Sequence, residues 1–328
     1  MTLQHVHTKK AEHPRRGSLC LAFLILLSFV LLLRRADVAT DRMREGLSLC
    51  ARAVLPSLFP FMVLSELLVA SGAGEWLLSP LARPLGKLLG LSRAGCCALV
   101  LGLACGFPTG ARGALLALEK GTLTRAECEH VLACSSIPSA AFLVSTVGGA
   151  LWGNVNFGVL LYAFAVFAAL LSGFFVYVMQ KRPKKELDFS SARPRVSIRF
   201  DAQMLTAAMK NATLNTLLIC AYVVFFFTLT GAVSLILGRF GASKSTHAIL
   251  SALLELSGGV SASARLADRS LAAALTGAAV GWSGLSVHCQ MLSLCEGHDV
   301  SLRPYFAAKL MQAVVLSVMA LLFGNSML

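Results

Sequence analysis

The chain has 328 residues, of which 56% are hydrophobic and only 14% are charged, with a mean hydropathy of +0.74. Soluble domains carry about 25% charged residues, so this composition excludes an ordinary soluble protein. The net charge of +13 does not indicate a nucleic-acid partner, because the basic residues flank apolar runs, where they orient the spans and face anionic membrane lipids. Several of these runs approach ~20 residues, the length of a membrane-crossing helix. The sequence therefore predicts an all-α, polytopic helical membrane protein.

Ordinary catalytic and metal-binding signatures are missing from the sequence. Nearly all of the ten cysteines lie within apolar runs and no CxxC pair occurs, so they read as small hydrophobic packing residues. No GxSxG, HExxH or Walker pattern is found. We therefore expect neither an enzyme nor a bound metal or cofactor.

The chain divides into four parts. Residues 1–45 form a basic N-terminus, an uncleaved first span over 18–33 and a charged loop from Arg34 to Glu45. A first repeat covers 46–179, a strongly basic cytoplasmic linker covers 180–202, and a second repeat covers 203–328.

The first repeat opens with an apolar segment over 47–71 that contains Pro56 and Pro60, which would kink a helix. Residues 72–93 are amphipathic and suit the membrane surface. The stretch 102–114, GLACGFPTGARGA, then breaks an apolar run with glycines and a proline. Its preceding arm, 94–105, would reach only ~18 Å, about half of a bilayer core. A span over 130–151 is interrupted by polar residues at 134–139, and a clean span covers 157–179.

The second repeat presents the same features in the same order. A long apolar run over 204–237 precedes a short arm with a Gly/Ser break at 257–262 (SGGVSA), a polar-interrupted span over 271–294 and a last span over 304–323. At an offset of 151 residues, the break at 106–111 falls on 257–262. Paired broken segments in two halves are typical of transporters with inverted repeats.

The two repeats are expected to be inverted, each with a re-entrant hairpin. An odd number of crossings per repeat gives that relation, and the basic residues then concentrate in cytoplasmic loops. A kinked helix that crosses the whole bilayer is the alternative for each broken segment.

Four motifs, GFPTGA, SSIPSAAFLVSTVG, LLELSGGVSA and GLSVHCQ followed by YFAAKLMQ, resemble sporulation integral membrane proteins of the YlbJ type. These belong to the nucleoside-recognition (Gate) domain family, which is similar to part of the concentrative nucleoside transporter fold. The resemblance covers roughly residues 46–325. It implies a multi-pass protein of the bacterial cytoplasmic membrane that acts in sporulation, and it identifies no substrate.

The first broken segment supplies four candidate site residues. Gly106, Pro108 and Gly110 would end a half-helix and let a solute approach the backbone, or they would serve tight helix packing. Arg112 would meet an anionic solute or a carboxylate, or would extend its charge to the membrane interface.

The second broken segment contributes Glu255 and Ser257. A charge at Glu255 needs compensation, so it would pair with Arg112, bind a cation or proton, or accept hydrogen bonds from a ligand. Glu66, inside its own span, is a further charge-pair candidate.

The two interrupted spans supply Ser135, Ser136, Ser286, His288 and Gln290. Their hydroxyl, imidazole and amide groups suit a neutral polar ligand or hydrogen bonds between helices, and for the serines packing is the favoured interpretation. Lys309 is expected to reach the interface or to pair with another charge.

The leading hypothesis is a secondary transporter or permease-like protein for a small polar, nucleoside-like solute. The alternative is a non-transporting membrane component that supports spore envelope or cortex assembly through protein partners. Those partners would be further copies of this chain or other sporulation membrane proteins.

Overall fold

The computed structural model describes residues 26–30, 32–180 and 201–324, and this part of the chain contains helices and no strands. The predicted all-α class is confirmed. The helices are α2 (Ala36–Leu49), η1 (Cys50–Val54), α3 (Leu55–Ala70), α4 (Ala73–Leu77), α5 (Ser79–Leu89), α6 (Arg93–Cys105), α7 (Phe107–Glu119), α8 (Arg125–Cys134), η2 (Phe142–Leu151), α9 (Val155–Met179), α10 (Ala202–Arg239), α11 (Lys244–Leu254), α12 (Leu256–Ala264), α13 (Arg269–Trp282), α14 (Gly284–Leu294) and α15 (Arg303–Gly324). Most of the predicted N-terminal anchor and of the basic linker lies outside the described residues.

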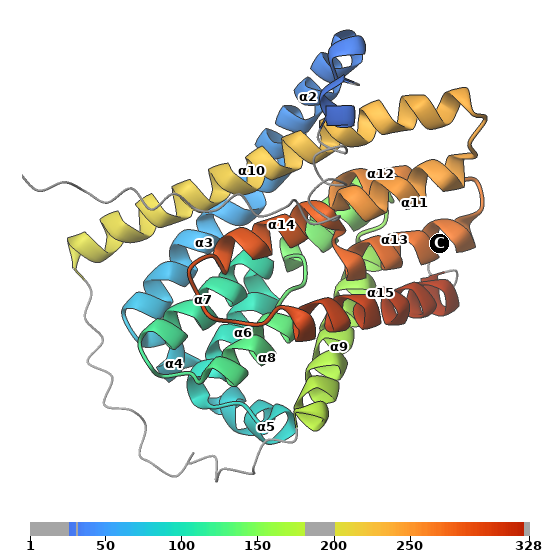
Figure 1. Cartoon of the computed structure of the whole chain (residues 1–328). Helices are drawn as coiled ribbons and strands as arrows, with labels where there is room; N and C mark the ends of the chain where they lie inside the picture. Colours follow the sequence, from blue (N-terminus) through green and yellow to red (C-terminus); the bar gives the residue numbers. More distant parts are fainter. Residues whose placement is uncertain (1–25, 31, 181–200, 325–328) are drawn as a thin grey trace, which may run out of the picture.

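Four helical stretches within the described part are long and apolar enough to cross a membrane: α9, α10, α13 together with α14, and α15. A fifth is reached if residues 80–105 count as one span, although its two helices are bent by 99°. Figure 1 shows α13 and α15 side by side, and α10 running diagonally past the helices of both halves.

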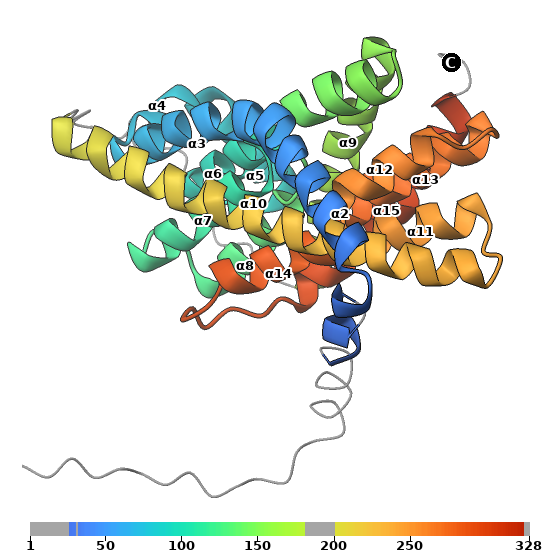
Figure 2. The ribbon, with the colours of Figure 1, turned by 90° about the horizontal axis from the view of Figure 1, so that it is seen from above.

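The charged segment from Arg34 to Glu45, predicted as a loop, is instead largely helical, and this prediction is wrong. It forms α2, which continues through η1 into α3. Ion pairs one turn apart, Arg42–Glu45 and Arg44–Asp41, support the helix and let its charged surface face outward. Figure 2 shows α2 crossing α10.

The π-helical segment η1 directly precedes Pro56, at the second residue of α3. A proline ring clashes with the carbonyl four residues earlier and provides no N–H, so the helix must widen or kink around it. The extra residue of a π-turn is one way to accommodate it. Pro60 lies inside α3 itself.

Both broken segments fold into short helical hairpins, as the re-entrant prediction requires, and not into kinked full spans. In the first hairpin, α6 and α7, a Cβ built on Gly102 would lie 2.8 Å from the Cα of Gly110. In the second hairpin, α11 and α12, a Cβ on Gly259 would lie 2.4 Å from the Cα of Ala252. Residues on either side of each turn therefore face each other.

The two hairpins open toward opposite ends of the bundle. The first opens where Glu119, at the end of α7, accepts a hydrogen bond from His298. The second opens near Arg269, whose guanidinium lies 5.6 Å from the ring centre of Trp152. The interrupted segment α8–η2 runs from the first end to Trp152. Opposite insertion agrees with an inverted pair, while the symmetry between the halves stays a prediction.

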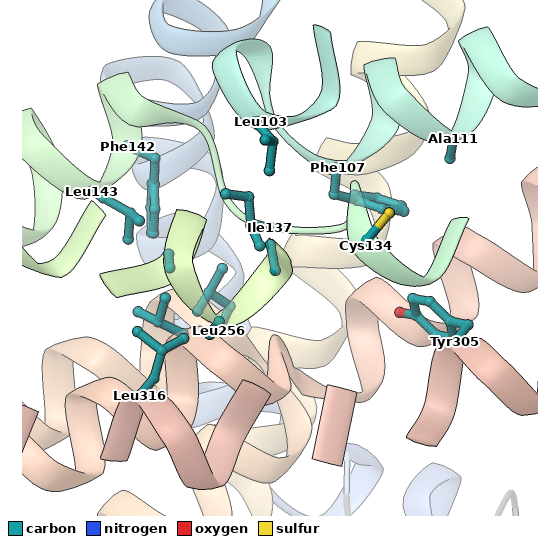
Figure 3. Close-up of a cluster of buried hydrophobic side chains, with 14 of the residues drawn as sticks. Leu103, Phe107, Ala111, Cys134, Ile137, Phe142, Leu143, Leu256, Tyr305 and Leu316 are labelled. Carbon is teal, nitrogen blue, oxygen red and sulfur yellow. The ribbon is translucent and has the colours of Figure 1, made fainter. Parts of the chain in front are cut away.

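One hydrophobic core joins the two halves behind the hairpin tips. Figure 3 shows Leu103 and Phe107 of the first hairpin, Ile137 and Phe142 of the interrupted segment, and Leu256 of the second hairpin gathered in this core. Close van der Waals packing of these side chains holds the two tips together, because lipid is as apolar as the side chains and supplies no hydrophobic driving force.

Candidate functional site

The breaks of both halves meet at one cavity of ≈ 80 Å³. Residues from both hairpin tips and from both interrupted spans line it, together with apolar side chains of η1, α3 and α10. The lining residues are Val54, Leu58, Gly106, Phe107, Pro108, Pro138, Ser139, Phe142, Ile219, Val223, Glu255, Leu256, Ser257, Ser283, Ser286, Val287 and Gln290.

The tip of the first hairpin is Gly106, which has a φ of 97°. This backbone conformation favours glycine, and a Cβ there would lie 2.9 Å from the backbone nitrogen of Ser139. The next residue, Phe107, donates its backbone N–H to the carbonyl of Ile137 at 2.7 Å. The first tip is therefore hydrogen-bonded to the non-helical break between α8 and η2.

The tip of the second hairpin is Glu255 itself. The predicted break at 257–262 was placed too late, because those residues belong to α12 and the chain is extended only at Glu255. The Glu255 carboxylate accepts a hydrogen bond from the backbone N–H of Gly258 at 2.6 Å and so caps α12. Because Glu255 caps the helix that follows it, the break between α11 and α12 falls at this acidic residue and not at the Gly-Gly pair.

The second tip lies against the break between α13 and α14, as the first tip lies against the break after α8. A Cβ on Gly284 would lie 2.9 Å from the Cα of Glu255. Ser283 has a φ of 70°, the left-handed conformation that separates the two helices. Each hairpin tip thus contacts the interrupted span of its own half.

The polar groups of the cavity come mainly from the second half. Gln290 donates its amide N–H to the hydroxyl of Ser286 at 3.3 Å, and both residues line the cavity with Glu255 and Ser257. A carboxylate, hydroxyls and an amide between apolar walls can accept and donate hydrogen bonds to a small polar molecule. The described residues contain no cluster of three or more His, Cys, Asp or Glu side chains suited to a metal ion.

Of the residues predicted for the site, the structure brings together Gly106, Pro108, Glu255, Ser257, Ser286 and Gln290. Gly110, Ser135 and Ser136 lie behind the cavity. Gly110 packs against Gly102 and Ser135, and the hydroxyl of Ser136 donates to the carbonyl of Leu132 at 2.6 Å.

His288 also lies away from the cavity. Its Nδ1 is 2.8 Å from the hydroxyl of Tyr305, and its ring contacts those of Trp282 and Phe306. Successive turns of α14 place Ser286 and Gln290 on one face and His288 on another.

Arg112 forms an ion pair with Glu66, and not with Glu255. The two side chains are 28% and 12% exposed and border a second, smaller pocket between α3 and α7. Glu255 lies at the central cavity, where its carboxylate caps α12, so the predicted pairing of Arg112 with Glu255 is corrected. Of the two carboxylates considered for Arg112, Glu66 is the partner.

Two groups of functional candidates were not predicted. Phe107, Ser139 and Phe142 line the central cavity next to the predicted breaks. They were not predicted, because an apolar run does not indicate which of its side chains face a cavity. Lys309 neither reaches the interface nor pairs with a carboxylate among the described residues; it is fully buried on α15 and donates to the carbonyl of Ser136.

The chain is similar to a known sporulation protein. It is 24% identical over 340 residues to the sporulation integral membrane protein YlbJ of Bacillus subtilis strain 168, across 93% of this chain and 82% of the relative. The resemblance to YlbJ-type proteins is confirmed, and together with the apolar helices it establishes a multi-pass membrane location. No family model matches the chain, so the Gate domain stays a prediction, and no solved structure matches it.

Proposed function

We propose that this protein is a permease-like sporulation membrane protein that binds a small polar solute in the central cavity. The observation that carries the proposal is the convergence of two hairpin tips, which enter from opposite ends, on one cavity with a buried carboxylate. Broken helices that meet between two halves are the usual solute sites of secondary transporters.

The size of the cavity constrains how a solute is held. Pockets for drug-sized ligands have volumes of about 300–1,000 Å³, and an apolar cavity of about 150 Å³ holds benzene. The cavity of ≈ 80 Å³ is therefore too small for a nucleoside in this conformation. A nucleoside-like solute requires the hairpin tips to separate, whereas a few water molecules or a very small metabolite fit as it stands.

The direct test is uptake of a mixture of small polar metabolites into proteoliposomes, with the retained compounds identified by mass spectrometry. We expect at least one compound to accumulate with the wild-type protein and much less with Ser257→Ala or Glu255→Gln. Ser263→Ala is the matched control, because Ser263 lies on α12, is buried and donates within its own helix to Gly259, outside the cavity.

Equal accumulation with empty liposomes would contradict transport. The sporulation role is tested separately in a Bacillus subtilis strain lacking YlbJ that expresses this chain. Restored sporulation that survives Ser257→Ala and Glu255→Gln at normal protein level would favour a non-transporting component that acts through protein partners.

A further inference from the structure

Lys309 places a primary amine inside the protein that the central cavity does not use. Its side chain is 0% exposed, on a helix long enough to cross a membrane. An ionised amine at such a position is costly and normally meets a carboxylate or a water-filled cavity. Among the described residues no carboxylate lies within ion-pair distance of it. When this amine is ionised, its charge has to be balanced by dipoles.

Those dipoles lie in the break after α8 and on the neighbouring turn of α15. The ammonium of Lys309 donates to the backbone carbonyl of Ser136 at 2.8 Å and to the side-chain oxygen of Gln312 at 3.1 Å. Gln312, three residues further along α15, donates to the carbonyl of Ala133 at 3.3 Å and to the hydroxyl of Ser172 at 2.9 Å. Together the two side chains of α15 cover the carbonyl end of α8, where the helix stops.

A helix that stops inside a membrane needs such partners. Its last carbonyls have no intrahelical donor and carry a partial charge of about −0.5 in total. In broken-helix transporters, unwound carbonyls and half-helix carboxyl ends bind dissolved cations. An ammonium has the same charge as a monovalent metal ion and three N–H donors.

At the corresponding break in the second half, Ser283 bonds the end of the helix. There the backbone N–H of Ser283 donates to the carbonyl of Ala279 at 2.7 Å, and its hydroxyl donates to the carbonyl of Val280 at 3.1 Å. One serine thus bonds two carbonyls in the last turn of α13, as the N–H of Ser135 and the hydroxyl of Ser136 do at the end of α8. The break after α8 differs in that the carbonyl of Ser136, beyond the helix, accepts the amine of Lys309.

We propose that the ammonium of Lys309 is a built-in cation, held in a carbonyl site that would otherwise take a dissolved monovalent cation. Ser136 and Gln312 supply two oxygen acceptors for the amine. Because Pro138 and Ser139 follow directly and line the cavity, Lys309 also positions that wall. The site forms independently of solute transport, so the proposal does not rest on the proposed function.

Chemical rescue of Lys309→Ala tests this assignment. The substitution removes three methylene groups and the amine, which together correspond to n-propylammonium. The full-length variant is extracted and purified in choline chloride or in n-propylammonium chloride at equal ionic strength, and its Tm is measured in detergent. Lys210→Ala, which removes an exposed lysine of α10, is the matched control.

We expect the Tm of Lys309→Ala to fall by several degrees in choline and to recover in part with propylammonium. Sodium chloride is the second probe, because a small cation could occupy the vacated carbonyl site. Wild type and Lys210→Ala should have the same Tm in all three salts. An unchanged Tm in Lys309→Ala, or a lowered one that neither cation raises above its value in choline, would overturn the proposal.

If folded Lys309→Ala can be purified only when propylammonium or sodium is present, the result supports the site. If no folded protein can be purified in any of the salts, the comparison of Lys309→Met with Lys309→Arg decides. Methionine fills the space without a charge and arginine keeps the charge, so a built-in cation requires arginine to retain more folded protein than methionine. The reverse order contradicts it.

Discussion

Gly102 and Gly110 pack backbone against backbone across the first hairpin, and a Cβ on Gly110 would lie 2.7 Å from the Cα of Gly102. No side chain separates α6 from α7 at this level. The two helices therefore pack closely at this level, and the tip of the hairpin lines the cavity.

The first prediction concerns this contact. Gly102→Ala and Gly110→Ala should each lower the free energy of unfolding by about 1–3 kcal/mol, because an added methyl group overpacks a backbone contact. Gly113→Ala on the same hairpin is the control, since its Cβ would lie an ordinary 3.5 Å from Ala98. That variant should be neutral or gain up to about 1 kcal/mol from the better helix propensity of alanine. Thermal unfolding in detergent measures all three, and equal losses would contradict the close contact.

The ion pair of Arg112 and Glu66 gives a second prediction. Arg112→Ala leaves the mostly buried carboxylate of Glu66 without its partner, so we expect a loss of about 2 kcal/mol, less than for a fully buried pair because both side chains keep some exposure. Removing both partners should cost less than the sum of the two single losses. A double-mutant cycle with Glu66→Ala measures that difference, and strict additivity would show that the two residues do not interact.

A third prediction separates the capping role of Glu255 from a role in solute binding. Glu255→Ala removes the acceptor for the N–H of Gly258 and should cost about 1 kcal/mol, as loss of an N-cap does. Glu255→Gln keeps a side-chain oxygen and should retain most of that stability. If solute uptake is lost in Glu255→Gln while its Tm stays near that of wild type, the charge serves the solute. Equal destabilisation by both variants would argue against the cap.

The fourth prediction concerns the polar contacts that tie the loop before α15 to α8. Arg125 pairs with Glu129 and Asp299, and Glu129 accepts the backbone N–H of Ser301 at 2.7 Å. Exposed pairs contribute about 1 kcal/mol or less each, so Arg125→Ala should barely change the Tm. It should instead increase amide hydrogen exchange over residues 296–301. Arg44→Ala, which breaks an exposed pair on α2, should leave exchange in this loop unchanged.

Much of the architecture could be predicted because helices that cross a membrane require long runs of apolar residues, which are easily recognised in a sequence. Long apolar runs identified α9, α10 and α15 closely, and glycine with proline marked the turn at Gly106. The turn at Glu255 was misplaced because two adjacent glycines looked like the weaker point. In the structure a carboxylate that caps the next helix stabilises the extended residue more effectively than glycine flexibility predicts.

The site was predicted in part for a related reason. Residues at breaks, such as Pro108 and Ser286, line the cavity because an interrupted helix exposes its ends to whatever lies between the halves. The partner of Arg112 could not be predicted, since Glu66 and Glu255 are equally acidic and only the packing of α3 against α7 selects between them. Lys309 shows the same limit, because its acceptors are backbone carbonyls of a distant segment.

The length of α10 bears on the membrane around the protein. Its 38 residues rise about 57 Å, nearly twice the ~30 Å thickness of a bilayer core. If α10 lay along the membrane normal, the lipid core could not cover its whole length. The helix must therefore tilt strongly or extend beyond the lipid at its ends. A steep lean would enlarge the area that the protein occupies in the membrane. α10 packs against helices of both halves. Changes in the local thickness or curvature of the membrane would therefore act on both halves through this helix.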